Sequence, residues 1–66
     1  MTIVANGKPC DISEGMTVAA YLRSRALAAG QVVIEYNREP LHRERFADTL
    51  LRAGDVLEIA QMVGGG

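Results

Sequence analysis

Apolar and polar residues alternate, or fall into short runs, so that the chain divides into strands and one helix. Residues 1–5 and 8–12 are two short segments separated by Asn6-Gly7. This dipeptide favours a tight hairpin because both of its positions accept a positive φ. Pro9 has no amide hydrogen to give to a neighbouring strand, which predicts that the second segment lies at a sheet edge. The chain therefore opens with a β-hairpin.

A helix is predicted over residues 18–29. Thr17 stands directly before the helix formers, where its hydroxyl can accept a hydrogen bond from the first turn and act as an N-cap. Gly30 is interpreted as the residue that ends the helix. One stripe of side chains falls at helical spacing and is predicted to be buried. The stripe comprises Val18, Tyr21, Leu22, Arg25 and Ala26.

The second half of the chain is predicted to add two strands. Residues 32–36 form the most β-branched run, which is typical of a central strand buried on both faces. Residues 37–40 are interpreted as a turn, and residues 41–51 as a mixed segment with at most one short helical turn. Residues 56–63 form the last strand.

The order strand, strand, helix, strand, strand predicts an α+β fold of the β-grasp, or ubiquitin-like, kind. One helix would pack on one face of a mixed four-stranded sheet. We expect residues 1–63 to form this single domain. Residues 64–66 are expected to protrude as a flexible glycine tail, because glycine has no side chain to pack and loses much conformational entropy when it is ordered.

Composition excludes several classes of protein. With 66 residues the chain can bury only one small core, and its one cysteine cannot form an internal disulfide or a cysteine-only zinc site. A net charge of −1 and 5% aromatic residues argue against nucleic-acid binding. No apolar run approaches the roughly 20 residues that span a membrane, and no signal peptide is visible. We therefore expect a cytoplasmic protein that works as a monomer.

Conventional catalytic constellations are also missing from the sequence. His42 is the only histidine and stands in a polar run, where a solvated surface position is the simplest interpretation. Cys10 lies in a predicted strand, where cysteine usually behaves as a small apolar residue. These residues predict no catalytic group, no metal site and no bound cofactor.

The candidate chemistry lies in the tail. Gly64, Gly65 and Gly66 would reach roughly 10 Å when extended, and the α-carboxylate of Gly66 is their only functional group besides amides. A glycine stalk could enter a narrow channel of a partner enzyme because no Cβ obstructs it. A carboxylate is a poor electrophile, so a nucleotide would have to activate it as an acyl-adenylate before a sulfur nucleophile could attack. The alternative is an ordinary frayed terminus.

A possible partner surface leads into this tail. Alternation along the last strand places Ala60 and Met62 on the face opposite Leu57 and Ile59. Exposed apolar patches often mark partner sites, so Met62 and Val63 are candidate contact residues. The alternative is that they simply close the core.

The whole chain resembles the ThiS family, the small ubiquitin-like sulfur carrier proteins of thiamine biosynthesis. The order of several short segments, with glycines at the end, carries the resemblance. These segments are Ile3-Val4-Ala5-Asn6-Gly7, Gly15-Met16-Thr17-Val18 with Tyr21-Leu22, Val33 to Asn37 with Arg38-Glu39, Gly54-Asp55-Val56-Leu57-Glu58-Ile59, and Val63-Gly64-Gly65-Gly66.

The resemblance implies a mechanism and a set of partners. An E1-like adenylyltransferase of the ThiF type would use ATP to adenylate the carboxylate of Gly66. A persulfide derived from a cysteine desulfurase would then replace AMP and leave a thiocarboxylate. Thiazole synthase of the ThiG type would take that sulfur. Gly64 and Gly65 would give access to the partners' sites, and the chain would be a co-substrate, not a catalyst.

Three alternatives remain open from the sequence. The small subunit of molybdopterin synthase shares the fold and the glycine tail, although such chains are usually longer. A ubiquitin-like protein modifier is a second alternative, and a binding module with an incidental tail is the third. Pro40 departs from the family pattern, where a β-branched residue is expected, and Cys10 matches no family role.

Overall fold

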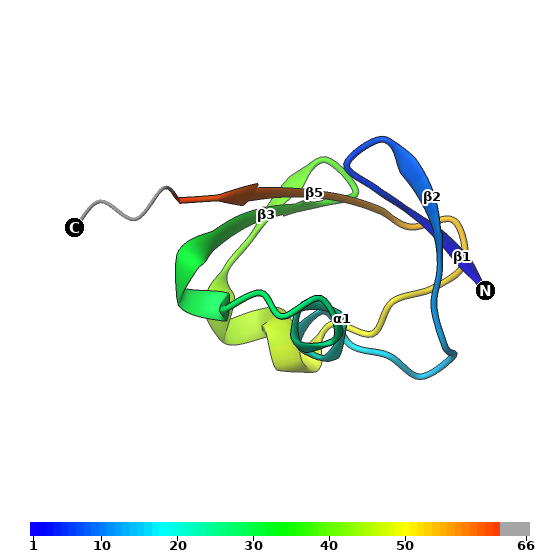
Figure 1. The fold of residues 1–66 in the computed structure, drawn as a ribbon, viewed down its shortest axis with the longest axis horizontal. Coiled ribbons are helices and arrows are strands. Elements are labelled where there is room, and N and C mark those ends of the chain that lie inside the picture. Colours follow the sequence, from blue (N-terminus) through cyan, green and yellow to red (C-terminus); the bar gives the residue numbers. More distant parts are fainter. Residues whose placement is uncertain (63–66) are drawn as a thin grey trace.

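A computed structural model gives the fold and describes residues 1–62. A twisted sheet lies over a single α-helix, as the sequence predicts (Figure 1). Two short 3₁₀ helices, named η1 and η2, complete the secondary structure of the described residues. The elements are β1 (Thr2–Ala5), β2 (Lys8–Asp11), α1 (Val18–Ser24), η1 (Ala29–Gln31), β3 (Val32–Tyr36), β4 (Glu39–Leu41), η2 (Arg43–Asp48) and β5 (Val56–Gln61).

The sheet has five strands in the order β2-β1-β5-β3-β4, one more than predicted. The extra strand is β4, in a region interpreted as turn and mixed segment. Asn37 (φ 51°) and Arg38 (φ 72°) complete the reversal in two residues. The chain after them is therefore free to pair at once with β3, where Pro40 lies opposite Glu35. An arginine at the second turn position hides this hairpin from sequence reasoning, because glycine is the usual signal there.

The sheet is mixed because β5 runs parallel to β1 and antiparallel to β3. The β1–β2 hairpin is as predicted, with Asn6 at φ 52° and Gly7 at φ 80°. β2, which contains Pro9, lies at the edge of the sheet. The prediction of an edge strand is confirmed.

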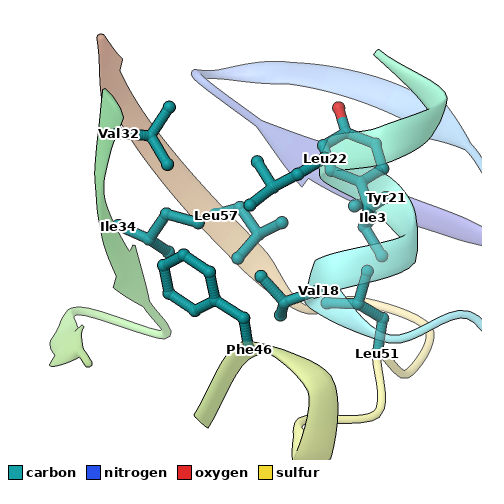
Figure 2. Packing of buried hydrophobic residues seen from close by; sticks show 9 residues of the cluster. All are labelled: Ile3, Val18, Tyr21, Leu22, Val32, Ile34, Phe46, Leu51 and Leu57. Carbon is teal, nitrogen blue, oxygen red and sulfur yellow. The ribbon is translucent and has the colours of Figure 1, made fainter. Parts of the chain in front are cut away.

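One hydrophobic core fills the space between the sheet, α1 and η2 (Figure 2). Its buried members are Ile3, Val18, Tyr21, Leu22, Val32, Ile34, Phe46, Leu51 and Leu57. β3 contributes to this core with one face only, since its Val33 is 57% exposed. The prediction that residues 32–36 are buried on both faces is therefore wrong, because the helix covers one side of the sheet and nothing in residues 1–62 covers the other (Figure 1).

α1 begins as predicted and ends early. The Thr17 hydroxyl accepts a hydrogen bond from the Ala20 amide at 3.1 Å, which confirms the N-cap. The helix ends at Ser24, not at residue 29, because Ala26 adopts a left-handed φ of 57°. The amides of Ala26 and Leu27 then donate back to the carbonyls of Arg23 and Leu22, at 3.0 and 2.9 Å.

This pattern is a Schellman cap, in which the left-handed position is usually glycine. Gly30 is therefore not the residue that ends the helix; it lies in η1. η2 has six residues, more than the one short turn predicted for this region. The wrong helix end and the underestimated length of η2 have the same cause. Alanine and polar residues there adopt conformations that their residue types do not predict.

Candidate functional site

β5 carries the chain toward one end of the molecule, away from the N-terminus (Figure 1). The strand ends at Gln61, and the Met62 amide still donates to the Gln31 carbonyl at 2.8 Å. The candidate residues Val63, Gly64, Gly65 and Gly66 lie outside the described residues. The described part of the site is therefore the base from which residues 63–66 continue.

An apolar patch lies at this base, on the sheet face that α1 does not cover. Met62 is 54% exposed and Val33 is 57% exposed, and Ala60 is exposed directly opposite Val33 in the β3–β5 register. We call Val33, Ala60 and Met62 the outer-face patch. The prediction that Ala60 and Met62 lie on the face opposite the buried Leu57 is confirmed.

Two carboxylates border the outer-face patch. Glu35 and Glu58 are exposed and lie directly opposite each other in the β3–β5 pairing. A shallow hollow of about 280 Å³ has these two side chains and the patch residues Val33 and Ala60 in its wall. Like charges opposite each other on neighbouring strands are destabilising. The pair therefore places two negative charges on this face, beside an apolar area.

A hydrogen-bond network fixes the start of β5. The Asp55 carboxylate accepts from the Tyr36 hydroxyl at 2.7 Å, from the Arg52 amide at 2.8 Å and from the Asn37 side-chain amide at 3.2 Å. The side-chain oxygen of Asn37 in turn accepts a hydrogen bond from the Val56 amide at 2.8 Å. The network thus joins the β3–β4 turn to the first residue of β5.

The network also shifts two pKa values. Burial acts to raise the pKa of Asp55, but the hydrogen bonds from Tyr36, Arg52 and Asn37, with the charge of Arg52, outweigh it and hold this pKa below its ordinary value. The pKa of Tyr36 is raised, first by its hydrogen bond to Asp55 and then by burial. Both pKa shifts favour the state in which Asp55 is ionised and accepts a hydrogen bond from the protonated Tyr36 hydroxyl.

A second polar cluster lies on the other side of the sheet, at the end of α1. Arg25 donates to the Cys10 sulfur at 2.6 Å, and its guanidinium stands over the Tyr21 ring at 5.3 Å from the centroid. The Tyr21 hydroxyl points away from the core and lies 3.8 Å from the same sulfur (Figure 2). Burial is the largest cause that raises the pKa of Tyr21, followed by its contacts with Cys10.

Sequence reasoning found only part of these arrangements. The prediction that Arg25 and Ala26 belong to the buried stripe is wrong, since both are exposed, and the sequence predicts no role for Cys10. The spacing of Tyr21 and Arg25 places them on one helix face, but their contact with β2 joins residues 15 apart, which local patterns do not show. The opposition of Glu35 and Glu58 likewise depends on the strand register, which a sequence does not reveal.

Among residues 1–62 no group of three or more histidine, cysteine, aspartate or glutamate side chains is arranged to hold a metal ion. His42 is exposed at the start of η2 and makes no capping hydrogen bond. No described helix is long and apolar enough to cross a membrane.

Comparison with known proteins gives a consistent result. The family model described as "ThiS family" matches residues 3–66. A curated protein named thiazole synthase, from Paramagnetospirillum magneticum, is 35% identical over 66 residues. The match covers 100% of this chain and 20% of the relative, so the chain spans about a fifth of the relative's length.

Two solved structures from Geobacter metallireducens have the same fold. The crystal structure of a thiamine biosynthesis protein (ThiS) has a TM-score of 0.84 and 36% sequence identity, and covers 100% of both chains. The NMR solution structure of a thiamine biosynthesis protein has a TM-score of 0.81 and 38% identity, and covers 100% of this chain and 88% of the other. The five-stranded sheet with one helix is therefore a β-grasp fold.

Proposed function

The chain belongs to the ThiS family, and on this premise we propose that it is a sulfur carrier for thiazole formation in thiamine biosynthesis. The α-carboxylate of Gly66 carries the sulfur, and Gly64 and Gly65 give the partner enzymes access to it. The observation that carries this proposal is the course of β5. The strand takes the chain to one end of the body, with exposed Met62 as the last described residue before Val63 and the glycines.

The chemistry proceeds in balanced steps. The Gly66 carboxylate attacks the α-phosphate of ATP, which gives an acyl-adenylate and releases pyrophosphate. The terminal sulfur of a persulfide then displaces AMP and forms an acyl disulfide. A second thiol reduces this disulfide by two electrons and leaves the thiocarboxylate on Gly66. Its sulfur is a good nucleophile because the thiocarboxylate is ionised near neutral pH.

The carrier acts as a co-substrate in this scheme, and its partners supply the catalytic groups. An E1-like adenylyltransferase of the ThiF type binds the ATP, and a cysteine desulfurase system provides the persulfide. Thiazole synthase of the ThiG type receives the sulfur. The carrier itself holds no cofactor and visits its partners in the cytoplasm as a monomer.

The outer-face patch, with Val63, is the surface that we propose for partner contact. Met62 directly precedes Val63 and the glycines in the sequence, and Glu35 and Glu58 add negative charge at the border of the patch. A partner surface that combines apolar groups with an arginine or lysine would cover the patch and neutralise the two carboxylates. Such a contact would reduce the repulsion between Glu35 and Glu58, and this would favour binding at this face.

Intact-mass spectrometry of the protein from sulfur-replete cells tests the proposal. We expect a species that is heavier by the exchange of one oxygen for sulfur, with the change localised to Gly66 by fragmentation. A variant extended by one alanine after Gly66 is the control, since it should fold equally well and show no such species. Absence of the sulfur species, even after incubation with the adenylyltransferase, ATP and the persulfide system, would contradict the proposal.

The pathway needs a separate experiment, because the molybdopterin branch uses the same chemistry. A deletion strain should require the thiazole moiety for growth, and the wild-type chain should restore growth without it. A strain that instead loses molybdopterin-dependent activity, and grows without thiazole, would assign the carrier to the other branch.

A further inference from the structure

The two edges of β5 are occupied differently. The Met62 amide donates to Gln31, and the Asn37 amide donates to the Val56 carbonyl, both at 2.8 Å. The backbone groups of even-numbered residues in this strand therefore face β3. Because backbone groups alternate in direction along a strand, those of Leu57, Ile59 and Gln61 face the other way, toward β1.

β1 covers only the first part of that edge. The Asn6 amide donates to the Leu57 carbonyl at 2.8 Å, and the chain then turns away at Asn6-Gly7. The Asn6 side chain adds one more link, since its oxygen accepts from the Ile59 amide at 2.7 Å. Beyond it, the Ile59 carbonyl and the Gln61 amide have no recorded backbone partner among residues 1–62. They form the open edge of β5.

A pocket of about 630 Å³ has Ile59 and Gln61 of the open edge in its wall, together with Ala5 and Asn6 at the end of β1. The turn of the β1–β2 hairpin, β2, the end of α1 and the end of β5 form its walls. Its lining includes Asn6, Cys10, Arg25, Leu27, Ile59 and Gln61. The pocket therefore offers room for the side chains of a strand added beside Ile59 and Gln61.

The charge of this pocket selects the kind of side chain that it accepts. Arg25 contacts the Cys10 thiol and the Tyr21 ring. The same two groups, and no carboxylate, raise the pKa of the Arg25 guanidinium. Lys8 lines the same pocket. The lining carboxylate, Asp11, accepts a hydrogen bond from the Thr2 hydroxyl at 2.7 Å. The pocket is thus complementary to an acidic side chain.

We propose that an extended segment of thiazole synthase adds to the open edge of β5 as a further strand. Its backbone would accept from the Gln61 amide and donate to the Ile59 carbonyl, and an acidic side chain of the segment would enter the pocket against Arg25. This rests on the proposed function, which names that partner. The Paramagnetospirillum magneticum relative is named thiazole synthase, and a region similar to this chain makes up 20% of that protein.

Amide hydrogen exchange, followed by NMR on the labelled full chain, tests the strand addition directly. The Gln61 amide should exchange fast in the free protein, and at least about tenfold more slowly when purified thiazole synthase from the same organism is bound. The Ala60 amide, which already faces β3, is the internal reference. Binding of thiazole synthase without protection of Gln61 would overturn the proposal.

Two pairs of variants give an independent measurement of affinity. Gln61→Pro removes the amide hydrogen and should weaken binding roughly fivefold, since a hydrogen bond contributes about 1 kcal/mol. Gln61→Ala keeps the amide hydrogen and should weaken binding less. Arg25→Glu should weaken binding by more than Arg25→Lys. Thermal melts establish that each variant is folded. Equal affinities within both pairs would contradict the proposal.

The remaining outcomes also decide the question. If Gln61 becomes protected only as protein concentration rises, with sedimentation showing a dimer, the occupant is a second copy and the proposal is wrong. Thiazole synthase that fails to bind at all equally overturns it. The proposed function is judged separately, by the sulfur species on Gly66, so a carrier with normal thiocarboxylate and an unprotected Gln61 would refute only the strand addition.

Discussion

The beginning and the end of β5, called here its anchored half and its open half, differ in burial and in strand pairing. Residues 56–57, the anchored half, lie between β1 and β3, and Leu57 is fully buried. Residues 58–61, the open half, pair with β3 on one side only, and Glu58, Ala60 and Gln61 are exposed. One strand therefore begins in the core and ends as a surface element.

This contrast separates stability from recognition along a single strand. The anchored half contributes buried apolar area and carries the hydrogen bonds of Asp55 at its start. The open half adds only the partly buried Ile59 to the core. It presents an apolar patch on one face and, at one edge, backbone groups without a backbone partner among residues 1–62. Substitutions in β5 should therefore fall into two classes. Those in the anchored half should destabilise the fold, whereas those in the open half should leave it folded but weaken binding to partner proteins.

The largest effect is expected for Leu57→Ala. Leu57 has no exposed surface and lies among Ile3, Val18 and Ile34, so its truncation leaves a cavity in a small core (Figure 2). The free energy of unfolding should fall by about 3 kcal/mol, measured by urea denaturation. Ala60→Ser, in the open half, is the matched control and should change it by less than about 0.5 kcal/mol. Similar losses in both halves would remove the distinction.

The next effect concerns the network at the start of β5. Asp55→Ala removes the acceptor for the Tyr36 hydroxyl and the Arg52 amide, so the free energy of unfolding should fall by about 1–3 kcal/mol. Asp55→Asn should lose less, because its carbonyl oxygen still accepts. Urea denaturation at neutral pH compares the two, and a stable Asp55→Ala protein would show that the anchored half does not need this network.

The same carboxylate predicts a pH dependence. The pKa of Asp55 in the folded protein lies below its ordinary value of 3.8, so the ionised form stabilises the fold above that pH. This stabilisation should be lost as the pH falls from about 4 through the folded-state pKa. The difference in unfolding free energy between wild type and Asp55→Asn should shrink over that range. A difference that stays constant with pH would mean that the network does not depend on the charge.

The anchored half was accessible to sequence reasoning, and the open half was accessible only in part. Alternation along residues 56–63 predicts that Leu57 and Met62 lie on opposite faces, because side-chain direction follows from period two. The structure buries the first and exposes the second. The alternation gives no register, so the opposition of Glu35 and Glu58, and how much of β5 is paired with β1, were not predictable. β4 was missed because Arg38 occupies a left-handed turn position without the glycine that signals it.

A smaller effect is expected at the boundary between the two halves. Asn6→Gly keeps the positive φ of the turn and removes the oxygen that accepts from the Ile59 amide at 2.7 Å. The free energy of unfolding should fall by about 1 kcal/mol. The exchange rate of the Ile59 amide should rise, whereas that of Ala60 should not. Asn6→Asp retains an acceptor and a tolerated conformation, and it should protect Ile59 better than Asn6→Gly.

The smallest effect on stability is expected for Met62→Ser, in the outer-face patch. Met62 is 54% exposed, and its recorded hydrogen bond uses the backbone amide, which serine also has. The free energy of unfolding should therefore change by less than about 0.5 kcal/mol. On the proposed function, adenylation of Gly66 should nevertheless slow, because the outer-face patch loses apolar area that contact with the partner would bury. Leu50→Ser is the control, since Leu50 is also exposed, at 48%, but lies outside β5. Equal adenylation rates for Met62→Ser and Leu50→Ser would contradict a specific role of the outer-face patch in contact with the partner.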